Sequence, residues 1–441
     1  MDIDERLEQV VVMGAAGKMG RGISWLLARE MARRMRDPAR RGRTHRLTLV
    51  DVREEGLTDL LGYIEAQATR HAARTIETLR PRYRGRAGVE TDEQVVRCFV
   101  ADVLSVVRTT ADGRQARGAR LVFEAVPEAE RLKIETLRHL NEWCPAETFF
   151  LSNTSSIPIQ VLDREADLGG RIVGFHFYNP PAVQELVELI TARETRPDLI
   201  ETAREIGRRL GKRLVPARDI AGFIGNGHFM REVLHALQAA ADLRDRFDES
   251  EAIYALNRVS QEGLVRPMGI FQLVDYVGID VACSILRVMG RHIPGETFQA
   301  DLLQRMVSRQ LVGGQHADGS QRDGFFRYAG RLAVSIYAPE RQEYVSLGTL
   351  GRVDRALGPL AEVAWKEVLD DPERGRRLRE HFARLASVDT LGAWLTTAYL
   401  RASRRIGRQL VADGVAESPE DVDTVLKSGF HHLYGPFDEI A

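Results

Sequence analysis

The residues of this chain that could carry out acid–base chemistry lie close together in sequence, within 152–188. His176 ends an apolar run, and Glu188 lies in a second apolar run twelve residues later. An unperturbed imidazole titrates near pH ~6.5, so such a histidine can accept and return a proton near neutrality. A carboxylate within hydrogen-bond reach would fix the tautomer of the ring and raise its proton affinity. We interpret His176 as a candidate general base and Glu188 as its partner. A buried structural histidine between two phenylalanines is the alternative.

Two short strands are expected to position the polar residues. The apolar run 149–151 leads into S-N-T-S-S at 152–156, and the run 172–175 leads into the second half of G-F-H-F-Y-N-P-P at 174–181. Runs of this length and composition are typical of buried strands. Open α/β sheets bind their ligands at the carboxyl ends of strands. The sequence therefore predicts that both polar clusters contribute to one ligand site.

A glycine-rich turn near the amino terminus indicates a dinucleotide site. An apolar strand runs into G-A-A-G-K-M-G-R-G at 14–22, and an amphipathic helix follows. Gly14 would permit the tight turn, Gly17 would let the backbone approach a pyrophosphate, and Gly20 would let the helix pack on the strand. The spacing is one residue longer than the usual G-x-G-x-x-G, a pattern that is weak alone but here has the required strand–helix context. The predicted cofactor contacts of this unit are Gly14, Gly17, Lys18, Met19 and Gly20.

The second strand, at 47–50, runs into Asp51. A carboxylate at this place would bind the adenosine ribose hydroxyls and repel a 2′-phosphate, which favours NAD over NADP. The arginine-rich segment 36–46 leaves NADP as the alternative, because its guanidinium groups could bind a phosphorylated ribose.

Length and composition exclude several classes of protein. A chain of 441 residues predicts two or three domains. With 62 basic and 63 acidic residues, the net charge gives no reason to expect nucleic acid or a membrane surface as a partner. The three cysteines lie far apart without metal-ligand spacing, so no metal is expected. The acidic amino terminus and the lack of an apolar run near ~20 residues predict a soluble, cytoplasmic protein.

These motifs together resemble those of the L-3-hydroxyacyl-CoA dehydrogenases, and the resemblance extends over nearly the whole chain. It implies NAD as cofactor, an acyl-CoA substrate, and a catalytic set of Ser155, His176, Glu188 and Asn226. The last of these lies in G-F-I-G-N at 222–226, similar to the G-F-I-x-N of the family. The family usually continues with arginine, whereas Gly227 and His228 stand here.

The resemblance also implies contacts outside the catalytic set. Glu128 and Lys133 match positions that line the cofactor, and Asn153 is expected near the nicotinamide. Asn179 is expected near the substrate. The charged helical region 56–100 would form a hairpin that touches CoA, with Arg70 and Arg74 as candidates for its phosphates.

An internal repeat suggests how the carboxyl-terminal half is organised. Four residues recur at an offset of 166: Glu251, Gly263, Gly269 and Phe271 return as Glu417, Gly429, Gly435 and Phe437. We therefore predict an α/β, Rossmann-type doubly wound domain at 1–217, followed by two related all-helical domains at 218–345 and 346–441, as in the dehydrogenase part of multifunctional fatty-acid oxidation enzymes. The helical copies should pair within the chain, and a homodimer or docking to a hydratase or thiolase is possible. A further strand is expected at 103–107.

Two other classes of function fit part of this pattern. A related dehydrogenase of a free 3-hydroxy acid, such as a sugar acid, would share fold and cofactor but would not need the hydroxyl-rich stretch 152–156. A non-catalytic nucleotide-binding homologue would not need Ser155, His176, Glu188 and Asn226 together.

Overall fold

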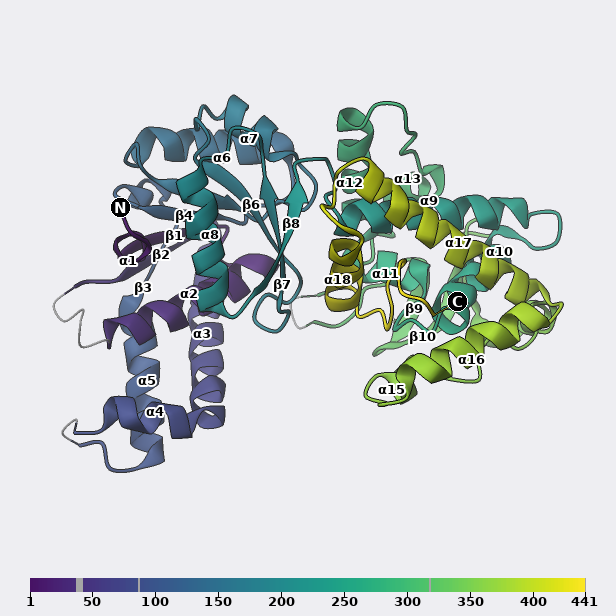
Figure 1. Ribbon diagram of the computed structural model, residues 1–441, viewed down its shortest axis with the longest axis horizontal. Coiled ribbons are helices and arrows are strands. Elements are labelled where there is room, and N and C mark those ends of the chain that lie inside the picture. Colours follow the sequence, from purple (N-terminus) through teal and green to yellow (C-terminus); the bar gives the residue numbers. More distant parts are fainter. Residues whose placement is uncertain (37–42, 86–87, 317–318, 441) are drawn as a thin grey trace. The chain divides into compact units, whose positions relative to one another are not determined.

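The computed structural model describes residues 1–36, 43–85, 88–316 and 319–440. The chain divides into two compact units, residues 1–219 and 220–441 (Figure 1). The first predicted domain boundary, after residue 217, lies two residues before this division.

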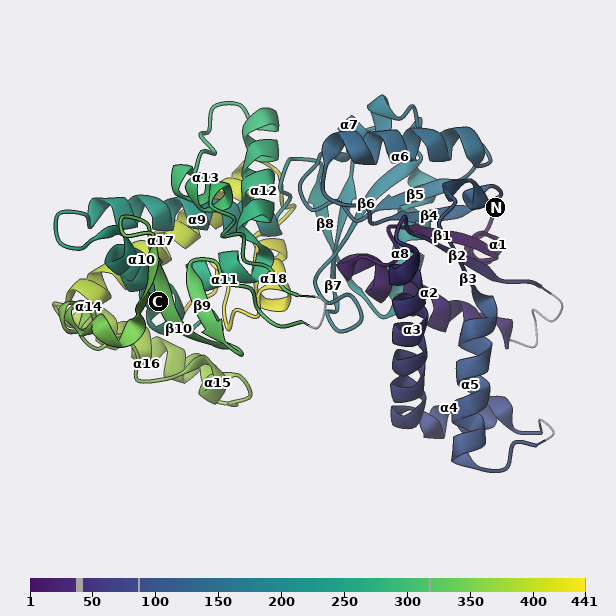
Figure 2. The same cartoon turned by 180° about the vertical axis from the view of Figure 1, so that it is seen from behind.

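The first unit is built on an eight-stranded sheet with the order β3-β2-β1-β4-β5-β6-β7-β8. All neighbouring strands are parallel except β6 and β7, which are antiparallel. The central strands are buried along their whole length, as expected for a sheet with helices on both faces (Figure 2). The strands are β1 (Gln9–Met13), β2 (Arg46–Val50), β3 (Val107–Thr110), β4 (Leu121–Glu124), β5 (Phe149–Ser152), β6 (Ile172–Phe177), β7 (Leu186–Thr191) and β8 (Arg213–Arg218).

Three helices of the first unit form an arm that extends away from the sheet (Figure 1). The helices of this unit are α1 (Ile3–Arg6), α2 (Lys18–Met35), α3 (Glu54–Arg74), α4 (Ile76–Tyr83), α5 (Asp92–Val106), α6 (Glu130–Trp143), α7 (Ile159–Glu165) and α8 (Pro197–Leu210), and α3 to α5 make the arm. The strand predicted at 103–107 is wrong, because α5 continues to Val106. Its buried side chains Val95, Phe99, Val103 and Val106 follow a helical period, which outweighs the strand preference of the valines.

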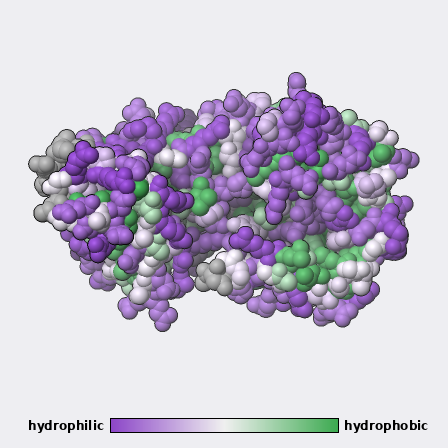
Figure 3. Space-filling model, turned by 90° about the horizontal axis from the view of Figure 1, so that it is seen from below, coloured by the Kyte–Doolittle hydropathy of each residue, from purple (hydrophilic) through white to green (hydrophobic). Residues whose placement is uncertain are grey.

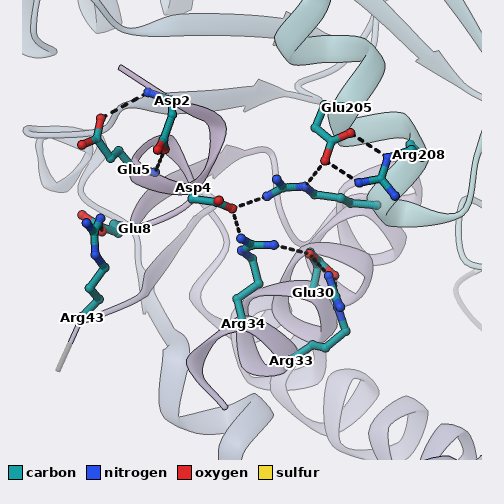
Figure 4. Close-up of polar contacts among 11 residues, drawn as sticks. Asp2, Asp4, Glu5, Glu8, Glu30, Arg33, Arg34, Arg43, Glu205 and Arg208 are labelled. Carbon is teal, nitrogen blue, oxygen red and sulfur yellow. Dashed lines mark hydrogen bonds and ion pairs between the residues drawn. The ribbon is translucent and has the colours of Figure 1, made fainter. Parts of the chain in front are cut away.

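Helix α1 is tied to two other helices by ion pairs (Figure 4). The Asp4 carboxylate contacts Arg34 on α2 and Arg209 on α8, and these side chains are at most 12% exposed. Glu205 accepts hydrogen bonds from Arg208 and Arg209. Shielding from solvent strengthens such contacts relative to exposed ion pairs.

The second unit is mainly helical, as predicted, but it also contains a small sheet. Strands β9 (Phe326–Ala329), β10 (Leu332–Ala338) and β11 (Glu343–Ser346) form an antiparallel sheet that the helical expectation missed. Gly330, with φ +65°, begins the two-residue turn between β9 and β10, a hairpin signal present in the sequence. The helices are α9 (Gly225–Asp242), α10 (Glu249–Arg258), α11 (Ile270–Val277), α12 (Ile279–His292), α13 (Asp301–Ser308), α14 (Gly351–Leu357), α15 (Trp365–Val368), α16 (Arg374–Ser387), α17 (Leu391–Ala412) and α18 (Pro419–Gly429), with a π-helical turn at Val259–Gly263.

Matching contacts support the internal repeat in the second unit. A Cβ at Gly269 would lie 2.3 Å from Oδ1 of Asn257, and a Cβ at Gly435 would lie 2.1 Å from Oδ1 of Asp423. Both pairs are related by the offset of 166, so the same close approach occurs twice. The first residue of α9 shifted by 166 is the first residue of α17, and these two helices pack against each other.

The outer surface is mostly hydrophilic on the face in Figure 3, with smaller hydrophobic areas. Val52, Val183, Leu332 and Trp394 are the large apolar side chains more than 60% exposed among the described residues. None of the helices in the described part of the chain is long and apolar enough to cross a membrane.

Candidate active site

The antiparallel pairing of β6 and β7 brings His176 and Glu188 together. The two residues are direct partners in the register, so their side chains lie on the same face of the sheet. His176 Nδ1 lies 2.8 Å from Glu188 Oε2, and Glu188 is fully buried. A carboxylate accepts hydrogen bonds only, so this contact places the imidazole proton on Nδ1 and the basic lone pair on Nε2. The predicted pair is therefore present with the geometry that a general base requires.

Tyr178 is a third member of this group that the sequence analysis missed. Its hydroxyl donates a hydrogen bond to Glu188 Oε2 at 3.0 Å, and its ring lies 5.0 Å from the ring of His176 between centroids. Burial and the neighbouring Glu188 carboxylate raise the pKa of Tyr178 well above its usual value, so it remains a neutral donor. Its position two residues after His176 is a signal for the same face of the strand.

The S-N-T-S-S stretch after β5 wraps around the carboxylate of Glu128. Glu128 Oε1 accepts hydrogen bonds from the backbone N–H groups of Ser155 and Ser156, at 2.9 and 3.0 Å, and from the Thr154 hydroxyl at 2.7 Å. The Ser155 hydroxyl lies 3.3 Å from the same oxygen. Glu128 therefore fixes the loop that carries Ser155.

Lys133 lies on the buried face of α6, with a side chain only 1% exposed. Its Nζ lies 2.8 Å from Glu124 Oε1, 3.1 Å from the Val126 carbonyl and 3.4 Å from Glu128 Oε2. Burial by itself would lower the pKa of Lys133, but Glu124 and Glu128 together raise it, so the ammonium group stays charged. The described contacts of Lys133 thus hold α6 to the end of β4 and to the segment after it, which includes Glu128.

Asn153 connects that loop to the strand of the histidine. Its backbone N–H donates to the Glu124 carbonyl at 2.8 Å, and its side-chain Oδ1 accepts from the Phe177 N–H at 2.9 Å. Asn179 follows β6 and is half-buried. Asn153 therefore contacts the end of β6, next to His176, and Asn179 lies in the segment that follows this strand.

The turn between β1 and α2 is so tight that two positions, Gly14 and Gly20, accept only glycine. Gly14 has φ +74°, and a Cβ there would lie 2.6 Å from the Ala125 carbonyl oxygen. A Cβ at Gly20 would lie 2.1 Å from the Gly14 carbonyl oxygen, so only glycine allows α2 to begin this close to β1. Helix α2 starts at Lys18 without a side-chain cap and without an acidic residue in its first turn, and Met19 follows in that turn. These features fit a pyrophosphate at the helix start.

Asp51 follows β2 and points back at this turn. Its Oδ2 accepts from the Ala16 N–H at 3.0 Å, and its Oδ1 accepts from the Arg53 N–H at 3.1 Å. Arg36 and Arg43, from the basic segment before β2, contact Asp102 and Glu8 instead. Residues 37–42 of that segment lie outside the described residues. Arg43 precedes β2, and Asp51 follows it. The strand has five residues at about 3.3 Å each, so its two ends are roughly 16 Å apart, and Arg43 lies at the other end of β2 from Asp51.

Two family models cover most of the chain. The 3-hydroxyacyl-CoA dehydrogenase NAD binding domain matches residues 9–220, and the 3-hydroxyacyl-CoA dehydrogenase C-terminal domain matches residues 222–323. The chain belongs to the 3-hydroxyacyl-CoA dehydrogenase family. The first unit is accordingly the NAD-binding domain of this family, and NAD is its cofactor.

Individual members of the family show how far the similarity extends. A probable 3-hydroxybutyryl-CoA dehydrogenase of Deinococcus radiodurans is 29% identical over 227 residues, which are 51% of this chain and 78% of the relative. The fatty acid oxidation complex subunit alpha of Shewanella amazonensis is 27% identical over 74% of this chain, but the match spans only 41% of that longer protein. The crystal structure of 3-hydroxybutyryl-CoA dehydrogenase from Escherichia coli shares the fold, with a TM-score of 0.62 at 20% identity over 98% of this chain and 90% of the other.

Asn226, the family position in the second unit, lies in the first turn of α9 and is half-buried. The two residues after it pack closely against α17. A Cβ at Gly227 would lie 3.2 Å from Leu410 on α17, and His228 Nε2 lies 3.2 Å from the Ser403 carbonyl oxygen on the same helix. Gly227 and His228 thus form part of the surface on which α17 packs.

Arg74 is exposed in the last turn of α3, on the arm, apart from the cluster around His176. Among the described residues, no group of three His, Cys, Asp or Glu side chains could hold a metal ion.

Proposed function

We propose that this member of the dehydrogenase family catalyses the reversible, NAD-dependent oxidation of an (S)-3-hydroxyacyl-CoA to the 3-oxoacyl-CoA. The observation that carries the proposal is the His176–Glu188 pair at the carboxyl edge of the sheet that also holds the glycine turn. Strands β1 and β6 are linked by parallel neighbours, so both features lie at the same edge. A Cβ at Gly22 on α2 would lie 3.0 Å from Pro181, so the cofactor helix touches the segment that follows His176.

The proton chemistry follows from the geometry of the pair. With Nδ1–H donated to Glu188, the lone pair of His176 Nε2 accepts the proton of the substrate hydroxyl. The Glu188 carboxylate offsets the positive charge that develops on the ring. General-base assistance of this kind contributes about 10²- to 10⁴-fold in rate. NAD, when bound, accepts the hydride from the carbon that carries the hydroxyl.

The remaining predicted residues bind and orient. We assign Ser155 and Asn226 to the substrate hydroxyl and the thioester carbonyl, and Asn179 to the same substrate. Gly14, Gly17, Lys18, Met19, Gly20 and Asp51 would hold the NAD, with Asn153 close to the nicotinamide. Glu128 and Lys133 are assigned to the lining of the cofactor, and the contacts of Glu128 also fix the Ser155 loop. Arg74 is assigned to a CoA phosphate on the exposed arm.

We also propose that the second unit consists of two copies, 218–345 and 346–441, of which only the first serves the substrate. The residue at the offset of 166 from Asn226 is Gly392. A Cβ there would lie 2.5 Å from Leu360 Cδ2 and 2.6 Å from the Leu357 carbonyl oxygen, so an asparagine does not fit. The second copy therefore supports the first structurally. A homodimer, or docking to a hydratase or thiolase, would use surfaces of the chain that the two copies do not bury against each other.

The assay that tests this function compares thioester and free acid. We expect the full chain to oxidise NADH with acetoacetyl-CoA, and to do so poorly with NADPH or with free acetoacetate. A long-chain 3-oxoacyl-CoA, in a parallel reaction, reports the preferred chain length. Equal rates with free acetoacetate and with its CoA thioester would contradict an acyl-CoA substrate.

A further inference from the structure

One oxygen atom of Glu188 serves two donors. His176 Nδ1 lies 2.8 Å from Glu188 Oε2, and the Tyr178 hydroxyl lies 3.0 Å from the same atom. Glu188 is fully buried and His176 is 8% exposed, so these contacts are shielded from water. Hydrogen bonds to a charged group are stronger in such surroundings than at the surface. Each donor must therefore affect how strongly the carboxylate holds the other.

The direction of this effect can be worked out. A hydrogen bond from Tyr178 stabilises the carboxylate charge and leaves less of it to stabilise a protonated His176. Among the described contacts of Tyr178, the titratable groups are His176 from β6 and Glu188 from β7. On the β5 side, the neutral Asn153 contacts Phe177, and the charged Glu128 pairs with Lys133. Tyr178 itself stays protonated, because burial and Glu188 raise its pKa.

We propose that Tyr178 is a positioning residue of the acid–base pair, which fixes the Glu188 carboxylate and weakens its hold on the proton of His176. The proposal rests on His176 being the base of the proposed function. By sharing Oε2 with the imidazole, the hydroxyl would limit how strongly the carboxylate stabilises the protonated ring. Tyr178 acts through Glu188 and does not itself transfer a proton.

The test removes the hydroxyl and keeps the ring. Tyr178→Phe is compared in the full chain with Tyr83→Phe, which removes another tyrosine–carboxylate bond, 2.7 Å to Asp102, in the arm. The readout is the pKa of His176, measured by NMR on labelled histidine and assigned with His176→Gln. We expect this pKa to rise by about 0.5 to 1 unit in Tyr178→Phe and to stay constant in Tyr83→Phe.

Kinetics supply a second readout. The acid limb of kcat/KM for oxidation should move to higher pH by the same amount in Tyr178→Phe, while the KM for the acyl-CoA changes less than about twofold. In a Glu188→Gln background, Tyr178→Phe should no longer shift the pKa of His176.

Two results would overturn the proposal: an unchanged His176 pKa in Tyr178→Phe, or an equal shift with and without the Glu188 carboxylate. The NMR titration needs no turnover. A wild-type chain inactive on acyl-CoA would therefore contradict the proposed function while the titration still decides the role of Tyr178.

Discussion

At the scale of single residues, carboxylates determine what the first unit can do. Glu188 orients His176, and Glu128 fixes the loop of Ser155. Asp51 accepts a hydrogen bond from the backbone of the glycine turn. The first two are engaged by protein donors that hold catalytic candidates in place. Asp51 also accepts backbone hydrogen bonds, yet it lies where the adenosine ribose of a dinucleotide is expected.

Asp51 should set the choice between NAD and NADP. Asp51→Ser removes the carboxylate that would bind the ribose hydroxyls and repel a 2′-phosphate, so the KM for NAD should rise about tenfold or more and the discrimination against NADP should fall. Asp59→Ser, on the exposed part of α3, is the matched control. Initial rates give kcat/KM for each nucleotide. If the ratio of kcat/KM for NAD to that for NADP is unchanged in Asp51→Ser, another group recognises the ribose.

The sequence predicted the His176–Glu188 pair but not its full environment. The strand ends and motifs placed His176 and Glu188 at one site. The antiparallel register that makes them direct partners depends on the fold of the connecting segment 178–185. The contact of Tyr178 with Glu188 could not be predicted without that register. That Lys133 lines the cofactor stays a prediction. The helical spacing of Lys133 with Leu137 and Leu140 places its side chain on the buried face of α6.

At the scale of elements, Asp275 ties α11 to the start of the small sheet. Its carboxylate accepts hydrogen bonds from the Phe325 N–H at 2.7 Å, the Phe326 N–H at 2.9 Å and the Tyr328 hydroxyl at 2.9 Å. Burial raises the pKa of Asp275 to about 7, although the three hydrogen bonds act in the opposite direction. The sequence signals of helix and hairpin could not show this contact, because it joins residues about fifty positions apart.

The raised pKa of Asp275 predicts a pH dependence of stability. Between pH ~4 and ~7 the folded chain holds a proton that the unfolded chain has released, so the free energy of unfolding should fall as pH rises, by at most ~1.4 kcal/mol per pH unit. Asp275→Asn imitates the protonated side chain and should remove this contribution, whereas the control Asp301→Asn, at an exposed position of α13, should keep it. Urea unfolding at pH 5, 6, 7 and 8 measures the slope. An identical slope in Asp275→Asn and the wild type would show that Asp275 does not carry a proton in the folded state.

At the scale of the whole molecule, the second unit has one core that both repeated segments share. Phe229 on α9 packs against Phe430 at the end of α18, and the Tyr434 hydroxyl donates to the Leu264 carbonyl at 2.9 Å. Helix α17 packs on α9 and on the π-helical turn, and α18 packs on α9. The recurring glycines predict a repeat from the sequence alone. The packing of α9 against α17 depends on side chains that the offset does not determine.

Removal of residues 346–441 tests this organisation. The truncated chain would expose the apolar surfaces of α9 and α10 that α17 and α14 cover, and it should dimerise or aggregate in sedimentation experiments, since a large exposed apolar face favours association. The full-length chain at equal concentration is the control. A truncated chain that stays monomeric, soluble and fully active would refute the internal pairing.

The central claim is that His176 acts as the proton acceptor of an NAD-dependent oxidation, and His176→Gln tests it most directly. The substitution keeps a polar side chain of similar length but removes the titratable ring. We predict that kcat with acetoacetyl-CoA and NADH falls at least ~10²-fold while the Kd for NADH, measured by fluorescence, changes less than about twofold. Near-normal turnover in His176→Gln, with NADH binding intact, would contradict the account.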